Sequence, residues 1–278
     1  MTSPYRDLDR PPLREADLRR ALLAPPGAVE PGLWRDIRVV DSTASTNADL
    51  LAAAQAGGPE GTVLVAEEQT AGRGRLDRGW VAPARSGLTF SALLRPNRVP
   101  PARRGWLPLL AGVAAAEALS ALATEVLVRL KWPNDVLAGP AERKMGGILV
   151  ELVGDAAVVG VGLNVTLRTD ELPAPTATSL AIEGAQVDRD SLLRAVLRRL
   201  AGRYESWIEG AGDPEPSGLR TAYVELCGTL GRPVRVVRAA QPDLLGTATG
   251  IDAFGQLVVD TADHGPHTVG AGDVIHVR

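Results

Sequence analysis

The chain is organised around a glycine- and arginine-rich stretch, EEQTAGRGRLDRGW, at residues 67–80. The stretch follows the apolar run Thr62–Ala66, so it is expected to be a loop that leaves a buried strand. Residues 72–79 alone hold three arginines and three glycines. Glycine lets backbone N–H groups approach a phosphate or carboxylate, and arginine adds fixed charge and forked donors. The loop therefore predicts an anion site, although a solvated loop without a ligand has the same composition.

The composition of the whole chain requires any anion site to be local. Its 278 residues are 45% hydrophobic and 23% charged, as in soluble globular proteins, and suffice for one large or two smaller domains. A net charge of −3 and a pI near 5.7 offer no general attraction for nucleic acid or an acidic membrane. The single cysteine, Cys227, excludes an intramolecular disulfide. No apolar run approaches the roughly 18 residues that a bilayer requires, and no signal core is evident, so a cytoplasmic protein is expected.

The chain before the loop contains a helix cap with two possible roles. Residues 1–35 are expected to form an N-terminal extension, disordered over residues 1–12 and helical over Leu13–Leu23. A strand at residues 37–40 precedes Ser45-Thr46-Asn47, which caps a helix through Ala56. Hydroxyl groups at a helix N-terminus cap the helix and can also bind a polar ligand, so both roles remain open.

The middle of the chain predicts a flat binding slot. After a strand at 87–94, a mostly apolar helix at 105–123 and a strand at 126–131, residues 132–135 form a proline-fixed turn. This turn presents Asn134 and Asp135, although a turn without a function has the same pattern. Two glycine-spaced strands then follow at 145–152 and 158–165. Side chains missing from one face of adjacent strands leave room for a planar or bicyclic ligand.

The remaining chain predicts a second, smaller unit. Helices at 189–208 and 219–226 are followed by short strands between residues 233 and 277, which predict a small barrel. The expected domains are thus 1–35, 36–227 and 228–278. All three histidines lie in the last 15 residues, and neither a Ser-His-Asp set nor a phosphate-binding G-x-x-x-x-G-K-[ST] loop is evident. A site rich in Arg and Lys suits a reaction that proceeds by positioning and charge neutralisation, such as attack of a carboxylate on the α-phosphate of ATP.

Five motifs in order resemble those of biotin protein ligases: STN at 45–47, QTAGRGR at 69–75, KWPND at 131–135, KMGGILVE at 144–151 and GVGLNV at 160–165. The resemblance covers roughly residues 37–278 and implies an α+β fold. Its catalytic domain would have a mixed sheet with helices, as in class II aminoacyl-tRNA synthetases, followed by a small C-terminal SH3-like barrel. The implied activity forms biotinyl-5′-AMP from biotin and Mg²⁺-ATP, then transfers biotin to a lysine of a biotin carboxyl carrier domain of an acyl-CoA or pyruvate carboxylase. A monomer or weak homodimer is expected.

The resemblance also assigns site residues, motif by motif. Catalysis would rest on Arg73, Arg75 and Lys144: the two arginines would hold the carboxylate and phosphate, and Lys144 would stabilise charge that builds in the transition state. No metal ligand is assigned, since magnesium would arrive with ATP. The residues implied for biotin are Ser45, Thr46, Asn47, Gln69, Gly72, Arg73, Gly74, Arg75, Lys144, Gly160 and Gly162, and those implied for ATP are Arg73, Arg75, Arg78, Asn134, Lys144 and Asn164.

One residue departs from the family pattern, and two other functions remain open. Asp77 stands where the family often has glycine, and its carboxylate could pair with a neighbouring arginine. A lipoate or octanoate ligase of the same fold is one alternative, although a lipoyl group offers no urea to Ser45, Thr46 and Gln69. A non-catalytic biotin sensor is the other, although it would not need Lys144. Because the leader is too short for a DNA-binding domain, removal of residues 1–30 is expected to leave catalysis largely intact.

Overall fold

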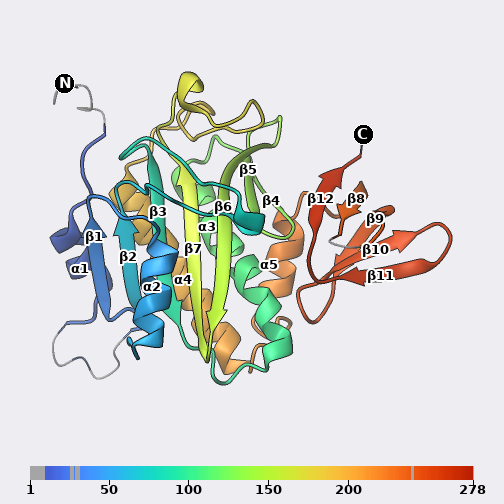
Figure 1. The fold of residues 1–278 in the computed structure, drawn as a ribbon, viewed down its shortest axis with the longest axis horizontal. Helices are drawn as coiled ribbons and strands as arrows, with labels where there is room; N and C mark the ends of the chain where they lie inside the picture. The colour runs from blue at the N-terminus through green and yellow to red at the C-terminus, as the bar shows by residue number, and fades with distance from the viewer. Residues whose placement is uncertain (1–9, 26–27, 29–31, 239–240, 278) are drawn as a thin grey trace.

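The structure, a computed structural model, describes residues 10–25, 28, 32–238 and 241–277. A seven-stranded sheet with helices on both faces is followed by a five-stranded antiparallel sheet (Figure 1). The expected mixed sheet with helices and the small C-terminal β domain are both confirmed. Of the residues expected to be disordered, 1–9 lie outside the described residues, whereas Arg10 is buried.

The large sheet has the strand order β1-β2-β3-β7-β6-β5-β4. The neighbours β1 and β2 are parallel and all other neighbouring pairs are antiparallel. The central strand β7 is buried along its whole length, which explains its run of apolar and small residues. The strands are β1 (Asp36–Val40), β2 (Thr62–Ala66), β3 (Gly87–Leu94), β4 (Val128–Lys131), β5 (Asp135–Ala138), β6 (Arg143–Val153) and β7 (Ala156–Asn164).

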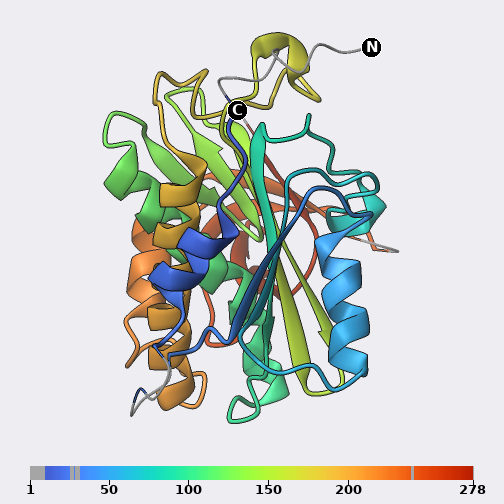
Figure 2. The same cartoon turned by 90° about the vertical axis from the view of Figure 1, so that its left-hand side faces the viewer.

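Helices cover the two faces of this sheet unequally. Figure 2 shows α2 (Thr46–Gln55) alone on one face, with the other helices on the opposite side. Those are α1 (Glu15–Leu22), α3 (Leu107–Leu122), α4 (Arg189–Glu209) and α5 (Leu219–Leu226). Short 3₁₀ turns occur at η1 (Arg75–Asp77), η2 (Pro101–Trp106) and η3 (Thr169–Glu171).

The helical stretch through η2 and α3 corrects one expectation. It spans 22 residues from Pro101 to Leu122, and its length and composition would suffice to cross a membrane. The statement that no apolar run approaches that length was therefore wrong. Two-thirds of the most apolar window is buried inside the fold, where α3 packs on the sheet and on α4. Such all-round burial explains why the helix is apolar on every side.

The C-terminal unit packs closely against the unit that is built on the large sheet. Its strands are β8 (Pro233–Val237), β9 (Leu244–Ile251), β10 (Leu257–Thr261), β11 (Gly265–Val269) and β12 (Asp273–His276), in the order β11-β10-β9-β8-β12. The indole nitrogen of Trp106 donates to the Ala253 carbonyl at 3.1 Å, and that of Trp132 donates to the Gly255 carbonyl at 3.0 Å. The β9–β10 turn is thus fixed against the unit that is built on the large sheet. Thr229 Oγ1 accepts from the Trp132 amide at 3.1 Å and lies 3.3 Å from His276 Nε2, so the end of β12 lies near the end of β4 (Figure 1).

Candidate active site

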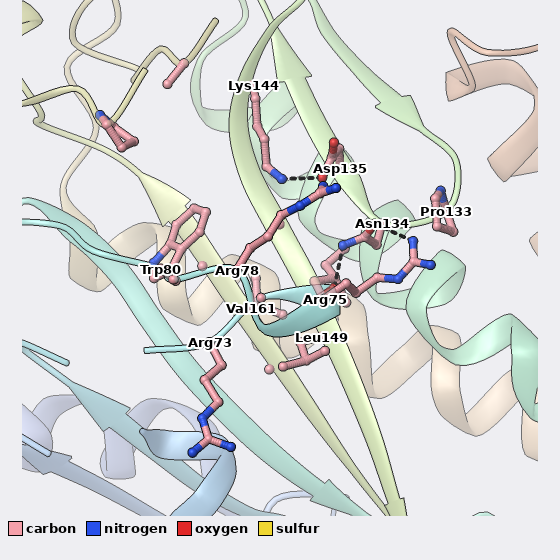
Figure 3. A pocket seen from close by; sticks show the side chains of 18 of the residues that line it. Arg73, Arg75, Arg78, Trp80, Pro133, Asn134, Asp135, Lys144, Leu149 and Val161 are labelled. Atoms are coloured by element: carbon pink, nitrogen blue, oxygen red, sulfur yellow. Dashed lines mark hydrogen bonds and ion pairs between the residues drawn. The ribbon is translucent and has the colours of Figure 1, made fainter. Parts of the chain in front are cut away.

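A cavity of about 530 Å³ lies between the 67–80 loop, the glycine-bearing faces of β6 and β7, and β12 (Figure 3). Its volume is typical of a small-molecule site. With the exception of Gly72, every residue that the resemblance assigned to biotin or ATP lines it. The C-terminal unit adds Val237, Asp273, Val274 and Ile275, which the motifs did not indicate.

A cluster of buried hydroxyl and amide groups forms one end of the cavity. Ser45 caps α2, since its Oγ accepts a hydrogen bond from the Ala48 amide at 3.4 Å. The backbone and hydroxyl of Thr46 donate to Gln69 Oε1 at 2.8 and 3.0 Å, and Ser91 Oγ lies 2.7 Å from Thr46 Oγ1. Ser91 was missed from the sequence, although a serine on a buried strand is a signal. The cluster is preorganised for a small polar group.

Asn47 forms the base of the slot beside this cluster. Its Nδ2 donates to Glu151 Oε2 at 2.7 Å and to the Leu149 carbonyl at 3.2 Å, while its Oδ1 accepts from Ser91 at 2.6 Å. A Cβ added to Gly160 would lie 2.2 Å from Asn47 Oδ1. The glycine is therefore required so that the amide can sit against β7.

The glycines of β6 and β7 form the slot that their spacing predicts. Gly147 pairs directly with Gly162 across the two strands. A Cβ added to Gly162 would lie 2.6–2.8 Å from three atoms of the Trp80 indole, so this ring rests directly on the glycine. Trp80 thus covers the surface on which a planar ligand would bind.

A lysine–carboxylate pair lies at the other end of the cavity. Lys144 Nζ donates to Asp135 Oδ1 at 2.5 Å, and Figure 3 shows the two side chains pointing toward each other. The antiparallel pairing of β5 with β6, which includes a bulge after Val136, brings them together. The chain has only two lysines, Lys131 and Lys144, and both line the cavity.

Two arginines tie the 67–80 loop to the rest of the protein. The Arg75 guanidinium donates to Asn134 Oδ1 at 3.2 Å and to the Gly272 carbonyl at 3.3 Å. Burial lowers the pKa of Arg75, Asp273 and Asp135 oppose that shift, and Arg78 adds to it. Arg78 itself forms an ion pair with Asp273. The loop is therefore held over the cavity by the C-terminal unit.

The remaining loop residues differ in their roles. Arg73 is exposed, and its side chain points away from the Lys144–Asp135 pair in Figure 3. The Gly72 carbonyl accepts from the Trp80 amide at 2.8 Å, and the Gly74 amide donates to the Arg78 carbonyl at 2.6 Å, so both glycines shape the loop. The Asp77 side chain lies outside the described residues.

Asn134 and Asn164 are both held by backbone groups. Asn134 Nδ2 donates to the Ile148 carbonyl at 2.9 Å, which leaves its Oδ1 directed to Arg75. Asn164 is buried, and its Nδ2 donates to the Thr178 carbonyl at 2.9 Å. Asn164 therefore fixes the segment that follows β7, part of which lines the cavity.

The donor set of the cavity suits a magnesium ion that arrives with phosphate. Asp135 and Asp273 are the lining carboxylates. Among the described residues, no group of three or more His, Cys, Asp or Glu side chains could hold a metal. Mg²⁺ is typically bound by one or two carboxylates together with substrate phosphates, which these two residues fit.

Comparison with known proteins gives consistent matches. Residues 37–166 match the biotin/lipoate A/B protein ligase family, and residues 229–277 match the biotin protein ligase C terminal domain. The chain is 42% identical to the biotin–[acetyl-CoA-carboxylase] ligase of Mycobacterium tuberculosis over 277 residues, which are 98% of this chain and 99% of the relative.

Solved structures with bound ligands are also similar. The Aquifex aeolicus biotin protein ligase in complex with biotin and ATP is 31% identical, with a TM-score of 0.71 over 88% of this chain and 100% of that chain. The Leishmania major biotin protein ligase in complex with biotinyl-5-AMP is 25% identical, with a TM-score of 0.58 over 85% of this chain and 99% of that chain.

Proposed function

The chain belongs to the biotin protein ligases of the biotin/lipoate A/B protein ligase family, and we propose that its two reactions take place in the cavity between the 67–80 loop and β12. The protein is an ATP-dependent ligase that activates biotin as biotinyl-5′-AMP and biotinylates carrier proteins of carboxylases. The observation that carries the assignment of the site is the glycine slot, with a polar cluster at one end and Lys144 at the other.

The polar cluster suits the ureido ring of biotin. A urea carries two N–H donors and one carbonyl acceptor, and the cluster of Ser45, Thr46 and Gln69 offers both kinds of partner. Because Gln69 Oε1 already accepts from Thr46, the orientation of its amide is fixed before the ligand arrives. The bicyclic ring would lie along Gly160 and Gly162, with Asn47 as the base. Binding there requires the Trp80 indole to move from Gly162 and close over the ring.

The charged end suits formation of the adenylate. A biotin carboxylate oxygen would attack the α-phosphorus of ATP, and the bond from that phosphorus to pyrophosphate would break. Lys144 would leave Asp135 and neutralise the charge that builds on the carboxylate and α-phosphate. Arg75 and Arg78 would hold the phosphates, with Asn134 orienting Arg75, and Arg73 would join them after its side chain turns toward this end of the cavity. Magnesium would supply further neutralisation of the triphosphate.

The second reaction needs no further nucleophile from this chain. The uncharged amine of the acceptor lysine would attack the carboxyl carbon of biotinyl-5′-AMP, and AMP would leave with the bonding electrons. Arg75 and Lys144 would retain the adenylate until the acceptor arrives. The loop and β12 meet over the cavity, so they would also keep water from the mixed anhydride.

The finer organisation follows the same reasoning. We propose a cytoplasmic monomer or weak homodimer without a nucleic-acid or membrane partner, because the net charge is −3 and the long apolar helix is two-thirds buried. We also propose the domain limits 1–35, 36–227 and 228–278. Light scattering of the purified protein with and without biotin and ATP tests the oligomeric state.

One mass measurement tests the function and its ligand. The acceptor would be a biotin carboxyl carrier domain, incubated with the protein, Mg²⁺-ATP and equal amounts of biotin and lipoate. The expected result is a shift by one biotin, lost in Lys144→Ala and retained in Arg220→Ala, whose guanidinium pairs with Glu215 and does not line the cavity. A lipoyl shift would instead assign a lipoate ligase, and ligand binding without any shift would indicate a sensor.

A further inference from the structure

The N-terminal segment Arg10–Leu13 bonds to residues that lead into one wall of the cavity. The Arg10 side chain is 2% exposed and forms an ion pair with Glu171 at 2.5 Å. Its guanidinium also donates to the Thr166 carbonyl at 2.8 Å. The chain continues from these two residues into 173–177, most of which lines the cavity. Arg10 therefore fixes the start of a cavity-lining segment.

The same segment completes a buried ion pair on the other side. Glu67 and Arg189 pair at 2.6 Å with side chains that are 3% and 5% exposed. The Leu13 amide donates to Glu67 Oε1 at 2.6 Å, and Arg189 Nη2 donates to the Pro11 carbonyl at 2.6 Å. Buried charges are tolerated only when they are paired and fully hydrogen-bonded. The N-terminal segment thus supplies one hydrogen bond to each partner of the pair.

This ion pair lies where the 67–80 loop joins the sheet. Glu67 is the first residue after β2, and its carbonyl accepts from the Arg85 amide at 2.8 Å. Arg189 Nη1 also donates to the Gly87 carbonyl, the first residue of β3, at 3.2 Å. Both ends of the chain between β2 and β3 therefore meet at this pair, and Gln69 of the polar cluster is only two residues from Glu67.

We propose that residues 10–13, named here the strap, position the 67–80 loop and the 166–177 segment around the bound adenylate. The proposal rests on the proposed function. The strap does not line the cavity, so its role is to position residues that do. Because of the contacts of the strap, we propose the opposite of the sequence-based prediction that residues 1–30 can be removed with little effect. Loss of residues 10–13 should weaken biotin binding and speed the release of biotinyl-5′-AMP.

Two truncations and two point variants test this role. Chains that begin at Arg10 or at Arg14 differ only in the strap, and Arg10→Ala is matched by Arg20→Ala, whose side chain is 78% exposed and pairs with Asp17. The measurements are KM for biotin, kcat, the release rate of biotinyl-5′-AMP and Tm. The expected result is a rise of about tenfold in KM and release rate for Arg10→Ala and for the chain that begins at Arg14, as for loss of a hydrogen bond to a charged group. The two controls should match the full chain.

The pattern of changes separates positioning from a stabilising role. A lower Tm with KM and release rate unchanged would show that the strap only stabilises the fold, and would overturn the proposal. If the full chain forms no biotinyl-5′-AMP, the proposed function fails. Trypsin cleavage in the absence of ligands then tests whether the strap positions the 67–80 loop. Arg10→Ala should then be cut faster than Arg20→Ala within residues 72–80 well below the Tm, and equal cleavage would overturn the proposal.

Discussion

A methyl group added at Gly162 should weaken biotin binding and leave the fold intact. The new Cβ would lie 2.6–2.8 Å from three atoms of the Trp80 indole. Trp80 belongs to the partly exposed loop, so the ring can move without displacing β7. We therefore expect Gly162→Ala to change the free energy of unfolding by less than about 1 kcal/mol, as for substitutions that disturb no buried network.

The added methyl group makes the slot shallower, and this weakens the binding of biotin. Overpacking a fitted site costs about 1–3 kcal/mol, and here that cost falls on the complex with biotin. The dissociation constant should therefore rise roughly 5- to 150-fold.

Gly160→Ala is the variant to compare with Gly162→Ala, because its Cβ would lie 2.2 Å from Asn47 Oδ1. Displacing Asn47 breaks its hydrogen bonds to Ser91 and Glu151. Two lost hydrogen bonds cost about 2 kcal/mol, so Tm should fall by roughly 4–8 °C. Gly250→Ala serves as the control, because a Cβ there would meet nothing within 4 Å.

Calorimetric titration with biotin and thermal unfolding of the three variants test the comparison. Gly162→Ala should lose affinity at nearly unchanged Tm, Gly160→Ala should lose both, and Gly250→Ala should resemble the unsubstituted protein. Biotin binding by Gly162→Ala with unchanged affinity would refute the placement of the ring on β7. Equal Tm values for Gly160→Ala and Gly162→Ala would refute the role given to the amide network.

Three further substitutions address the charged groups. Lys144→Ala should slow pyrophosphate release roughly 100- to 1,000-fold, as for removal of one donor to a transition-state charge, and a rate within threefold would exclude that role. Asp273→Asn removes the partner of the exposed Arg78, so Tm should barely change while trypsin cuts the loop faster; unchanged cleavage would show that the pair does not hold the loop. The hydrogen bond from Arg232 lowers the pKa of Glu142 below its ordinary 4.5, so this carboxylate stabilises the fold above that value and the gain is lost as pH falls through the lowered pKa. Glu142→Gln should therefore lower Tm at neutral pH, and its difference from the unsubstituted protein should shrink as the pH falls below 4.5 in a thermal-unfolding series; a constant difference would contradict this.

Most of the fold could be read from apolar blocks bounded by glycine and proline. The strands at 62–66 and 87–94 and the helix at 219–226 have the limits expected from the sequence. The strand β5 was missed because four residues after a proline turn are too few to show an alternation of apolar and polar side chains. Tertiary pairing with β6, rather than local preference, makes these residues a strand.

Of the site, the sequence could predict the segments but not the partners of their side chains. The motifs indicate the slot and the arginine loop, because the required glycines are local features. The pairing of Lys144 with Asp135 depends on a strand register that includes a bulge. The links from the loop to Gly272 and Asp273 join residues almost 200 positions apart, which no local pattern encodes.

The placement of the two lysines makes this protein easy to follow by amine chemistry. Lys131 and Lys144 both line the cavity, and all other strongly basic side chains are arginines, which acylating reagents leave unmodified. A mild acylating agent should therefore modify the chain at the active site and at its α-amine alone. Peptide masses after such labelling, recorded with biotin, ATP or both present, would report occupancy of each part of the cavity directly. The two lysines of the unsubstituted protein thus serve as sites for covalent footprinting of the cavity.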